Sequence, residues 1–196
     1  MARAFSSPTR NSIRRSTPFD GLAVPTDDLL GTPLGPVRVD TDARRVALGC
    51  PGLVAWDEPH AAEHSLEVHL PFILRVLGDV PVLPLVVGRA GDDVVADVID
   101  AVWGGSETLV VVSTDLSHYH PYEEAVVRDR ATAANVEAGR VTAIGPYDAC
   151  GCHPLRGLLV SARRRGLPAR TVDLRNSGDT AGDRDRVVGY GAFLVA

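Results

Sequence analysis

TLVVVSTDLSHY, residues Thr108 to Tyr119, joins an apolar run to a group of polar side chains. The first five residues are uncharged and mostly β-branched, which predicts a strand buried on both faces of a sheet. Asp115 and His118 follow at a spacing of three residues, so one loop can direct both into one cleft. Open α/β sheets carry their chemistry at the carboxyl ends of such strands. Alternatively, Asp115 caps the next helix and His118 is a solvated loop residue.

Outward from this stretch, apolar runs alternate with helical periodicities along the chain. Helices are predicted over residues 41–50, 63–77, 92–103, 122–138 and 146–165. Strands are predicted over residues 21–25, 37–40, 53–56, 81–87, 108–112, 169–174 and 187–195. Pro71 falls inside the second helix and either kinks it or marks its true start. The alternation predicts an α/β fold with a three-layer αβα sandwich and one domain.

Composition excludes several classes of protein. The net charge is −5 and acids are mixed with bases throughout, which argues against a nucleic-acid or anionic-membrane partner. No apolar run approaches the roughly 20 residues that span a bilayer. The basic run Arg163–Arg165 ends a predicted helix, where it complements the helix dipole. Three cysteines without an extracellular spacing favour a reducing, cytoplasmic setting.

Residues 1–17, MARAFSSPTRNSIRRST, are rich in Arg and Ser and contain no acid. Transit peptides share this composition, but the stretch lacks clear amphipathic spacing. It is therefore predicted to be disordered or a misannotated start. The α/β domain is expected to occupy residues 18–196.

A second polar cluster comprises Glu63, His64, Glu67 and His69 at the start of a predicted helix. His64 and Glu67 are three residues apart and can share a helical face, whereas His69 points elsewhere. This spacing suits metal ligation or an acid–base pair. The alternative is a first helical turn whose acids favour the N-terminal dipole.

Cys150 is expected where a loop turns into a helix, and there the dipole lowers the pKa of a thiol. A thiolate is a nucleophile or a soft ligand for zinc, copper or iron. Cys150-Gly151-Cys152-His153 looks like a zinc knuckle, but the sequence contains no second ligand pair. An isolated Cys can also be a small buried hydrophobe.

Other motifs indicate structure rather than ligand binding. The acids between Asp179 and Asp185 lack the closing Glu of a calcium-binding loop. Gly189-Tyr190-Gly191, inside the last predicted strand, indicates close backbone approach. P-loop, dinucleotide-binding and nucleophile-elbow motifs are absent from the sequence.

Four stretches together resemble the MEMO family, whose bacterial members are called AmmeMemoRadiSam system protein B. They are EHSLEVHLPF at Glu63–Phe72, VVVSTDLSHY at Val110–Tyr119, DACGCHPL at Asp148–Leu155 and VVGYGA at Val187–Ala192. The resemblance is collinear from about Phe19 to Ala196. It implies a fold similar to that of class III extradiol dioxygenases, which hold a non-heme metal on two His and an acid. In the MEMO family it implies two His and one Cys.

The resemblance assigns roles to the singled-out residues. Cys150 matches the cysteine ligand of the metal. Asp115 and His118 match a pair lining the same pocket, with His118 as acid–base or substrate-binding residue and Asp115 as its orienting partner. The second polar cluster is expected to bind substrate or to support the site; it is the set Glu63, His64, Glu67 and His69.

The two histidine ligands of the family lie upstream, in a Pro-His-Ala-Gly loop and a Gly-Pro-Ser-His loop. The second should fall near Arg14 or Arg15, and residues 1–17 contain no His. The fold is therefore expected to lack its first strands, as a truncated member of the family. Either the gene model begins late or crosses a frameshift, or the protein is a degenerate copy. In both cases the site for iron, copper or zinc is expected to be incomplete.

The leading functional hypothesis is a dioxygenase-like pocket that, in the full-length form, binds a non-heme metal, with the reaction left open. The alternative is a non-catalytic module that holds a protein or peptide in the same pocket. The resemblance also implies radical-SAM and AMMECR-type proteins of the same system as partners.

Overall fold

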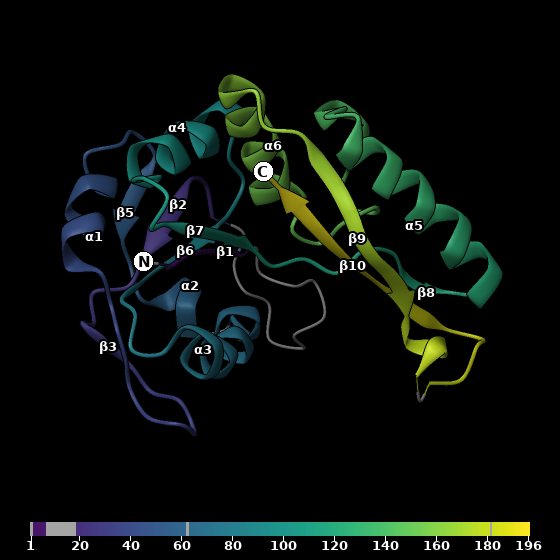
Figure 1. Ribbon diagram of the computed structural model, residues 1–196, viewed down its shortest axis with the longest axis horizontal. Helices are drawn as coiled ribbons and strands as arrows, with labels where there is room; N and C mark the ends of the chain where they lie inside the picture. Colours follow the sequence, from purple (N-terminus) through teal and green to yellow (C-terminus); the bar gives the residue numbers. More distant parts are fainter. Residues whose placement is uncertain (1, 7–18, 62, 181) are drawn as a thin grey trace.

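The computed structural model describes residues 2–6, 19–61, 63–180 and 182–196. Its main body is a five-stranded sheet in the order β5-β2-β6-β1-β7 (Figure 1). These strands are β1 (Ala2–Ser6), β2 (Leu22–Val24), β5 (Leu53–Ala55), β6 (Val82–Val87) and β7 (Leu109–Val112). All pairs are parallel except β2 with β6. Because helices alternate with these strands along the chain, the predicted α/β class is confirmed.

Helices cover both faces of the five-stranded sheet (Figure 1). One side carries α1 (Thr41–Ala47), α4 (Asp92–Val102) and α6 (Cys152–Arg165), and the other carries α2 (Glu58–Ala61) and α3 (His64–Leu77). Strand β6 serves both sides, because successive side chains of a strand point to opposite faces. Its Leu83, Leu85 and Val87 pack with α1 and α4, whereas its Val82 and Val86 pack with α3.

Strand β7 is an edge strand, which corrects the prediction that it is buried on both faces. Leu109 is 47% exposed, and the three valines that follow are only partly buried. Among the described strands only β1 pairs with it. Strands β2 and β6, by contrast, are buried along their whole length. A run of β-branched residues does not distinguish these two positions, because it specifies a strand and not its neighbours.

Residues 2–6 form β1 in the interior of the sheet, although the stretch 1–17 was predicted to be disordered or misannotated. Ala2 pairs in parallel with Val82 of β6 on one side and with Leu109 of β7 on the other. Two ladders of backbone hydrogen bonds thus hold this strand, and such bonds do not require a β-branched sequence. The rest of that stretch, residues 7–17, lies outside the described residues.

The last two predicted strands do not join the main sheet. Strand β10 (Val187–Val195) pairs antiparallel with β9 (Ala169–Asn176) and with β8 (His118–His120), forming a separate three-stranded sheet. Helix α5 (Tyr122–Glu137) packs on β9 and β10 (Figure 1). A third apolar cluster fills the space between this unit and α6; it contains Leu116, Val136, Ile144, Ala149, Cys152, Leu155 and Leu159.

The shorter elements also differ from prediction. Strand β4 (Val37–Arg38) pairs with β3 (Leu29–Leu30), a short strand that the sequence did not predict. Short 3-10 helices occur at Val141–Ala143 and Ser177–Asp179. Within the part of the chain that the structure describes, no helix is long and apolar enough to cross a bilayer.

The helix boundaries follow from capping. Asp40 accepts a hydrogen bond from the backbone N–H of Ala43 at the start of α1. Glu63 caps α3 by accepting from the N–H of Ser65 at 2.7 Å. Helix α3 then continues through Pro71, so this proline does not mark the start of the helix. Helix α6 begins only at Cys152, six residues later than predicted.

Helices α4 and α6 are joined by charged side chains. Arg164 donates to Asp93, Asp97 and Asp100 of α4 at 2.7–2.8 Å. Arg165 also binds Asp100, and its guanidinium lies over the ring of Trp103. The basic run does end α6, where a dipole role was predicted, but tertiary structure gives all three of its members specific partners, since Arg163 donates to the carbonyl oxygen of Gly139 at 2.5 Å.

The two helices also approach closely at Gly157 of α6. A Cβ atom built there would lie 2.3 Å from Cγ1 of Val95. We predict that Gly157→Ala lowers the free energy of unfolding by about 1–3 kcal/mol, because overpacking outweighs the roughly 1 kcal/mol that Ala gains over Gly in a helix. Urea denaturation measures this difference.

Gly31→Ala is the matched control, since no atom lies within 4 Å of the added Cβ and the change should be small. A stabilised Gly157→Ala variant would contradict the close approach of α4 and α6.

Candidate metal centre

The polar residues after β7 belong to a loop that leads into β8. Leu116 is fully buried in the third apolar cluster and so anchors the loop between Asp115 and His118. His118 is the first residue of β8, which pairs with Val188 of β10. The side chains of Asp115 and His118 stay partly exposed, at 41% and 29%. The buried Leu116 therefore holds the loop in place, while the side chains of Asp115 and His118 on either side of it reach the protein surface.

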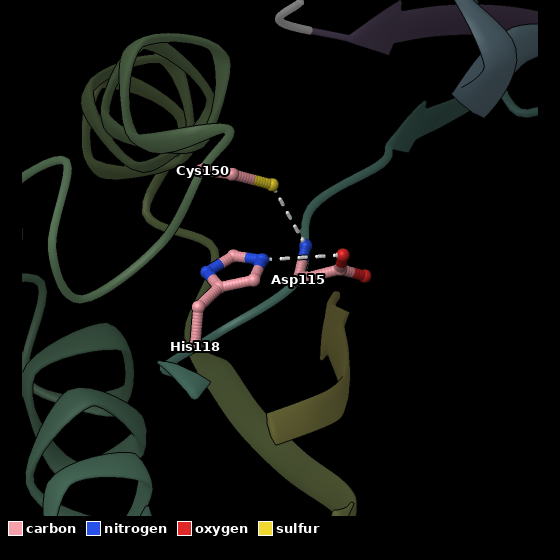
Figure 2. A group of neighbouring side chains, drawn as sticks. All are labelled: Asp115, His118 and Cys150. Carbon is pink, nitrogen blue, oxygen red and sulfur yellow. Dashed lines mark hydrogen bonds and ion pairs between the residues drawn. The ribbon is translucent and has the colours of Figure 1, made fainter. Parts of the chain in front are cut away.

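Cys150 comes from a second segment, two residues before α6. The backbone N–H of Cys150 donates to the carbonyl oxygen of Asp115 at 3.1 Å. In return, the N–H of Asp115 donates to the Sγ of Cys150, also at 3.1 Å (Figure 2). Thr114 strengthens this junction, because its Oγ1 accepts from the N–H of Gly151 at 2.8 Å. These bonds fix the thiol beside the loop after β7.

Asp115, His118 and Cys150 form one cluster (Figure 2). Their donor atoms all lie within 4.8 Å of one another, and Nε2 of His118 is 3.5 Å from Oδ2 of Asp115. The prediction that these three residues converge is confirmed. Among the described residues, this is the one group of at least three acids, His and Cys whose donor atoms lie close enough together to hold a metal ion.

The cluster suits a borderline or soft metal ion. It offers one sulfur, one imidazole nitrogen and one carboxylate oxygen, and three protein ligands with an open position are typical of catalytic zinc sites. Two donors at about 2.0–2.3 Å from one ion lie at most about 4.6 Å apart. In a tetrahedral site the donors lie closer still, so the three side chains would have to move toward one another to bind one ion.

Burial raises the pKa of the Cys150 thiol, which corrects the prediction of a lowered value. Loss of hydration is the largest cause, and the Asp115 carboxylate acts in the same direction. The hydrogen bonds from Asp115 N–H and Thr114 lower the pKa but do not compensate. The predicted dipole effect fails because Cys150 precedes the helix and is largely buried. A bound cation would reverse this balance.

Tyr119 and Tyr190 border the cluster. The sequence did not indicate either tyrosine as a site residue. Tyr119 has a positive φ of 61°, a strained conformation for a non-glycine residue, and its ring centroid is 5.9 Å from that of His118. Burial raises the pKa of the Tyr190 phenol, and the nearby charges of Asp115 and Tyr119 add to this. In the sequence, Tyr190 shows only as the aromatic residue between Gly189 and Gly191.

The second predicted cluster lies apart from this group, on α3. His64 and Glu67 do share a face, with 3.4 Å between Nδ1 and Oε2, and both side chains are exposed. His69 contacts the carbonyl oxygen of Ser65 through its Nδ1, and Glu63 serves as the helix cap. In the described part of the chain these four residues are not grouped with Asp115 as metal ligands. Their predicted roles toward a substrate stay predictions.

The remaining cysteines are structural. Cys152 is buried in the third apolar cluster and Cys50 packs against the core between the sheet and α1 and α4. All three cysteines are free thiols. Cys152 is thus a small hydrophobic residue of the core, and among the described residues neither Cys152 nor His153 lies with Cys150 in a group that could hold a metal ion.

An α/β domain with a thiol, an imidazole and a carboxylate at one edge defines a class of candidate metal-binding proteins. A family profile described as Memo-like protein matches residues 18–194. The chain is 36% identical over 177 residues to a MEMO1 family protein of Aeropyrum pernix, covering 84% of this chain and 63% of the relative. It is 34% identical over 174 residues to a MEMO1 family protein of Methanothermobacter thermautotrophicus, covering 81% and 62%. The chain therefore belongs to the Memo-like family, and it spans less than two thirds of the length of these relatives.

The raised pKa of Cys150 leads to a test on the metal-free protein. In a Cys50→Ser/Cys152→Ser variant, alkylation of Cys150 by iodoacetamide should be slow at pH 7. Its rate should rise about tenfold per pH unit up to a pKa above that of a free cysteine, because only the thiolate reacts. A rate that levels off below pH 8 would contradict the raised pKa.

Proposed function

We propose that this protein is a metal-binding member of the Memo-like family in which Cys150, His118 and Asp115 face one ion of iron, copper or zinc. The observation that carries the proposal is the convergence of three different donor atoms within 4.8 Å. These donors come from two segments 35 residues apart, held together by the mutual hydrogen bonds of Asp115 and Cys150. Such an ion, when bound, would supply Lewis-acid or redox chemistry at an open position.

We also propose that the fold is a three-layer αβα sandwich similar to that of class III extradiol dioxygenases. Helices on both faces of the five-stranded sheet support it. Under this reading Cys150 is a ligand through its Sγ. His118 either binds the ion directly or holds a proton at Nε2 as an acid–base group. Asp115 Oδ2, at 3.5 Å, orients the imidazole in the second case.

The family resemblance implies two further histidine ligands from upstream loops, and the sequence contains no His before His60. We expect the three residues alone to bind a metal ion weakly, since each absent ligand leaves a position for water. We likewise propose that this chain shares the activity and substrate of its longer relatives, and that radical-SAM and AMMECR-type proteins are its partners. We also propose a cytoplasmic location, and the three free thiols support that location.

The second candidate is a non-catalytic module that holds a protein or peptide in the same place. Tyr119 and Tyr190 favour it, because both are large aromatic side chains left exposed beside the cluster. Aromatic residues of this kind are enriched at binding surfaces. Metal binding through Cys150 distinguishes the two candidates.

Cobalt(II) titration tests the metal centre, because a thiolate ligand produces a sulfur-to-cobalt charge-transfer absorption. Cys150→Ser should abolish this absorption and weaken Co²⁺ binding at least about tenfold, since the soft ligand is lost. Cys50→Ser, which changes a partly buried thiol packed against the core away from the cluster residues, should leave both unchanged. Equal spectra for the native protein and Cys150→Ser would contradict the proposal and favour the peptide-binding module.

Two further variants separate the roles of His118. If Nε2 binds the ion, His118→Gln should weaken Co²⁺ binding by about 10–100-fold. If His118 is an acid–base group, the same variant should leave the affinity nearly unchanged. Asp115→Asn is the companion variant, because it keeps the shape of the side chain and removes its charge. Isothermal titration calorimetry of the same proteins gives the affinities.

A further inference from the structure

Backbone hydrogen bonds to β10 hold the middle of the loop between Asp115 and His118. The N–H of Leu116 donates to the carbonyl oxygen of Gly189 at 2.9 Å, and the N–H of Gly189 donates to that of Ser117 at 2.8 Å. These two bonds attach the loop to β10. They leave the N–H of Ser117, a fully buried residue between Asp115 and His118, to find an acceptor elsewhere.

Asp129 of α5 provides that acceptor. Its Oδ1 accepts from the N–H of Ser117 at 3.0 Å, and the residue is only 2% exposed. Within the described residues Asp129 takes part in no ion pair, unlike the acids of α4. Neither the cluster residues nor the salt-bridge network explains this buried acid. Among the described residues, the one hydrogen bond of its carboxyl group is to the backbone of the site loop.

Gly189 shows how closely the Asp129 carboxyl group is packed. A Cβ atom built on Gly189 would lie 2.0 Å from Oδ2 and 2.5 Å from Cγ of Asp129. The carboxyl group therefore occupies the space of the missing side chain. The close backbone approach predicted from Gly189-Tyr190-Gly191 is confirmed here. Asp129 is thus packed against β10 at the residue that also binds Leu116 and Ser117.

The hydroxyl of Ser117 is not what Asp129 binds. Its Oγ is buried and has no hydrogen-bond partner among the described residues. The contact is to the peptide N–H, so it constrains the backbone that leads from Asp115 to His118. An acceptor mounted on a sixteen-residue helix is a rigid support for such a loop.

We infer that Asp129 is a positioning residue for the metal centre: by holding the Ser117 amide against β10, it keeps Asp115 and His118 turned toward Cys150. The inference rests on the proposed function, because the quantity that it controls is the geometry of the three donors. Supporting residues of this kind typically change metal affinity by 10–100-fold when they are removed. Asp129 itself does not touch the metal or a substrate.

The test compares Asp129→Ala, Asp129→Asn and Ser117→Ala in the full chain, with Co²⁺ as the probe. Asp129→Ala removes the acceptor and should raise the Kd for Co²⁺ by about 10–100-fold. Asp129→Asn keeps an oxygen that accepts from Ser117 N–H, so its Kd should stay within about threefold of the native value. Ser117→Ala removes only the unpartnered hydroxyl and should leave the Kd unchanged.

Two variants separate positioning from general stability. Val136→Ala on the same helix removes packing in the third apolar cluster, so it should lower Tm without changing the Kd of the folded protein. Gly189→Ala should act like Asp129→Ala, because its Cβ displaces the carboxyl group. If Asp129→Ala lowers Tm as Val136→Ala does and leaves the Kd unchanged, the residue is structural only and the inference is wrong.

A metal-free measurement keeps this inference separate from the proposed function. The N–H of Asp115 donates to Sγ of Cys150, so a displaced loop should change the alkylation rate of Cys150 at fixed pH. Asp129→Ala should change this rate at least about threefold and Asp129→Asn should not, with the other two cysteines replaced by Ser. If the native protein shows no cobalt–thiolate absorption, the metal proposal fails, and the alkylation rates alone decide the role of Asp129. Unchanged rates would overturn it.

Discussion

The candidate site depends on the pair of hydrogen bonds between Asp115 and Cys150. One runs from the backbone N–H of Cys150 to the carbonyl oxygen of Asp115, and the other from the N–H of Asp115 to the cysteine Sγ. They join the end of β7 to the start of α6, two segments that belong to different layers of the fold. Each partner is held in turn by apolar packing, through Leu116 on one side and Cys152 on the other. Without this junction a thiol and an imidazole from distant parts of the sequence would have no reason to meet.

Burial and a neighbouring carboxylate both act on the Cys150 thiol at this junction. Burial and the Asp115 carboxylate both raise the pKa of the Cys150 thiol, so the metal-free site favours the neutral form. The acids of α4, by contrast, are each matched with an arginine of α6. A cation bound between Cys150, His118 and Asp115 would remove the repulsion that the carboxylate imposes on a thiolate.

Membership of the Memo-like family rests on a match across residues 18–194 and on relatives that are longer than this chain. The matched part contains the two helical layers, the three-stranded sheet and the cluster of Asp115, His118 and Cys150. Strand β1 precedes that matched part and lies between β6 and β7. The site is thus carried by elements within the family match.

Local spacing in the sequence determined most of the elements and the identity of the cluster. The periodic apolar positions of α3 and α4 and the uncharged run of β6 specify these elements by themselves. Polar residues directly after a strand and before a helix indicated Asp115, His118 and Cys150, because chain direction places such positions at an edge of the sheet.

Only the tertiary structure decided which strands are neighbours and which groups lose their hydration. The edge position of β7, the interior strand β1 and the separate sheet of β8, β9 and β10 depend on backbone pairing, which side-chain patterns do not encode. The raised pKa of Cys150 and the contact of Asp129 with Ser117 N–H arise from burial by segments distant in sequence. Spacing along a chain reports local geometry, whereas desolvation and long-range hydrogen bonds exist only once the layers have packed.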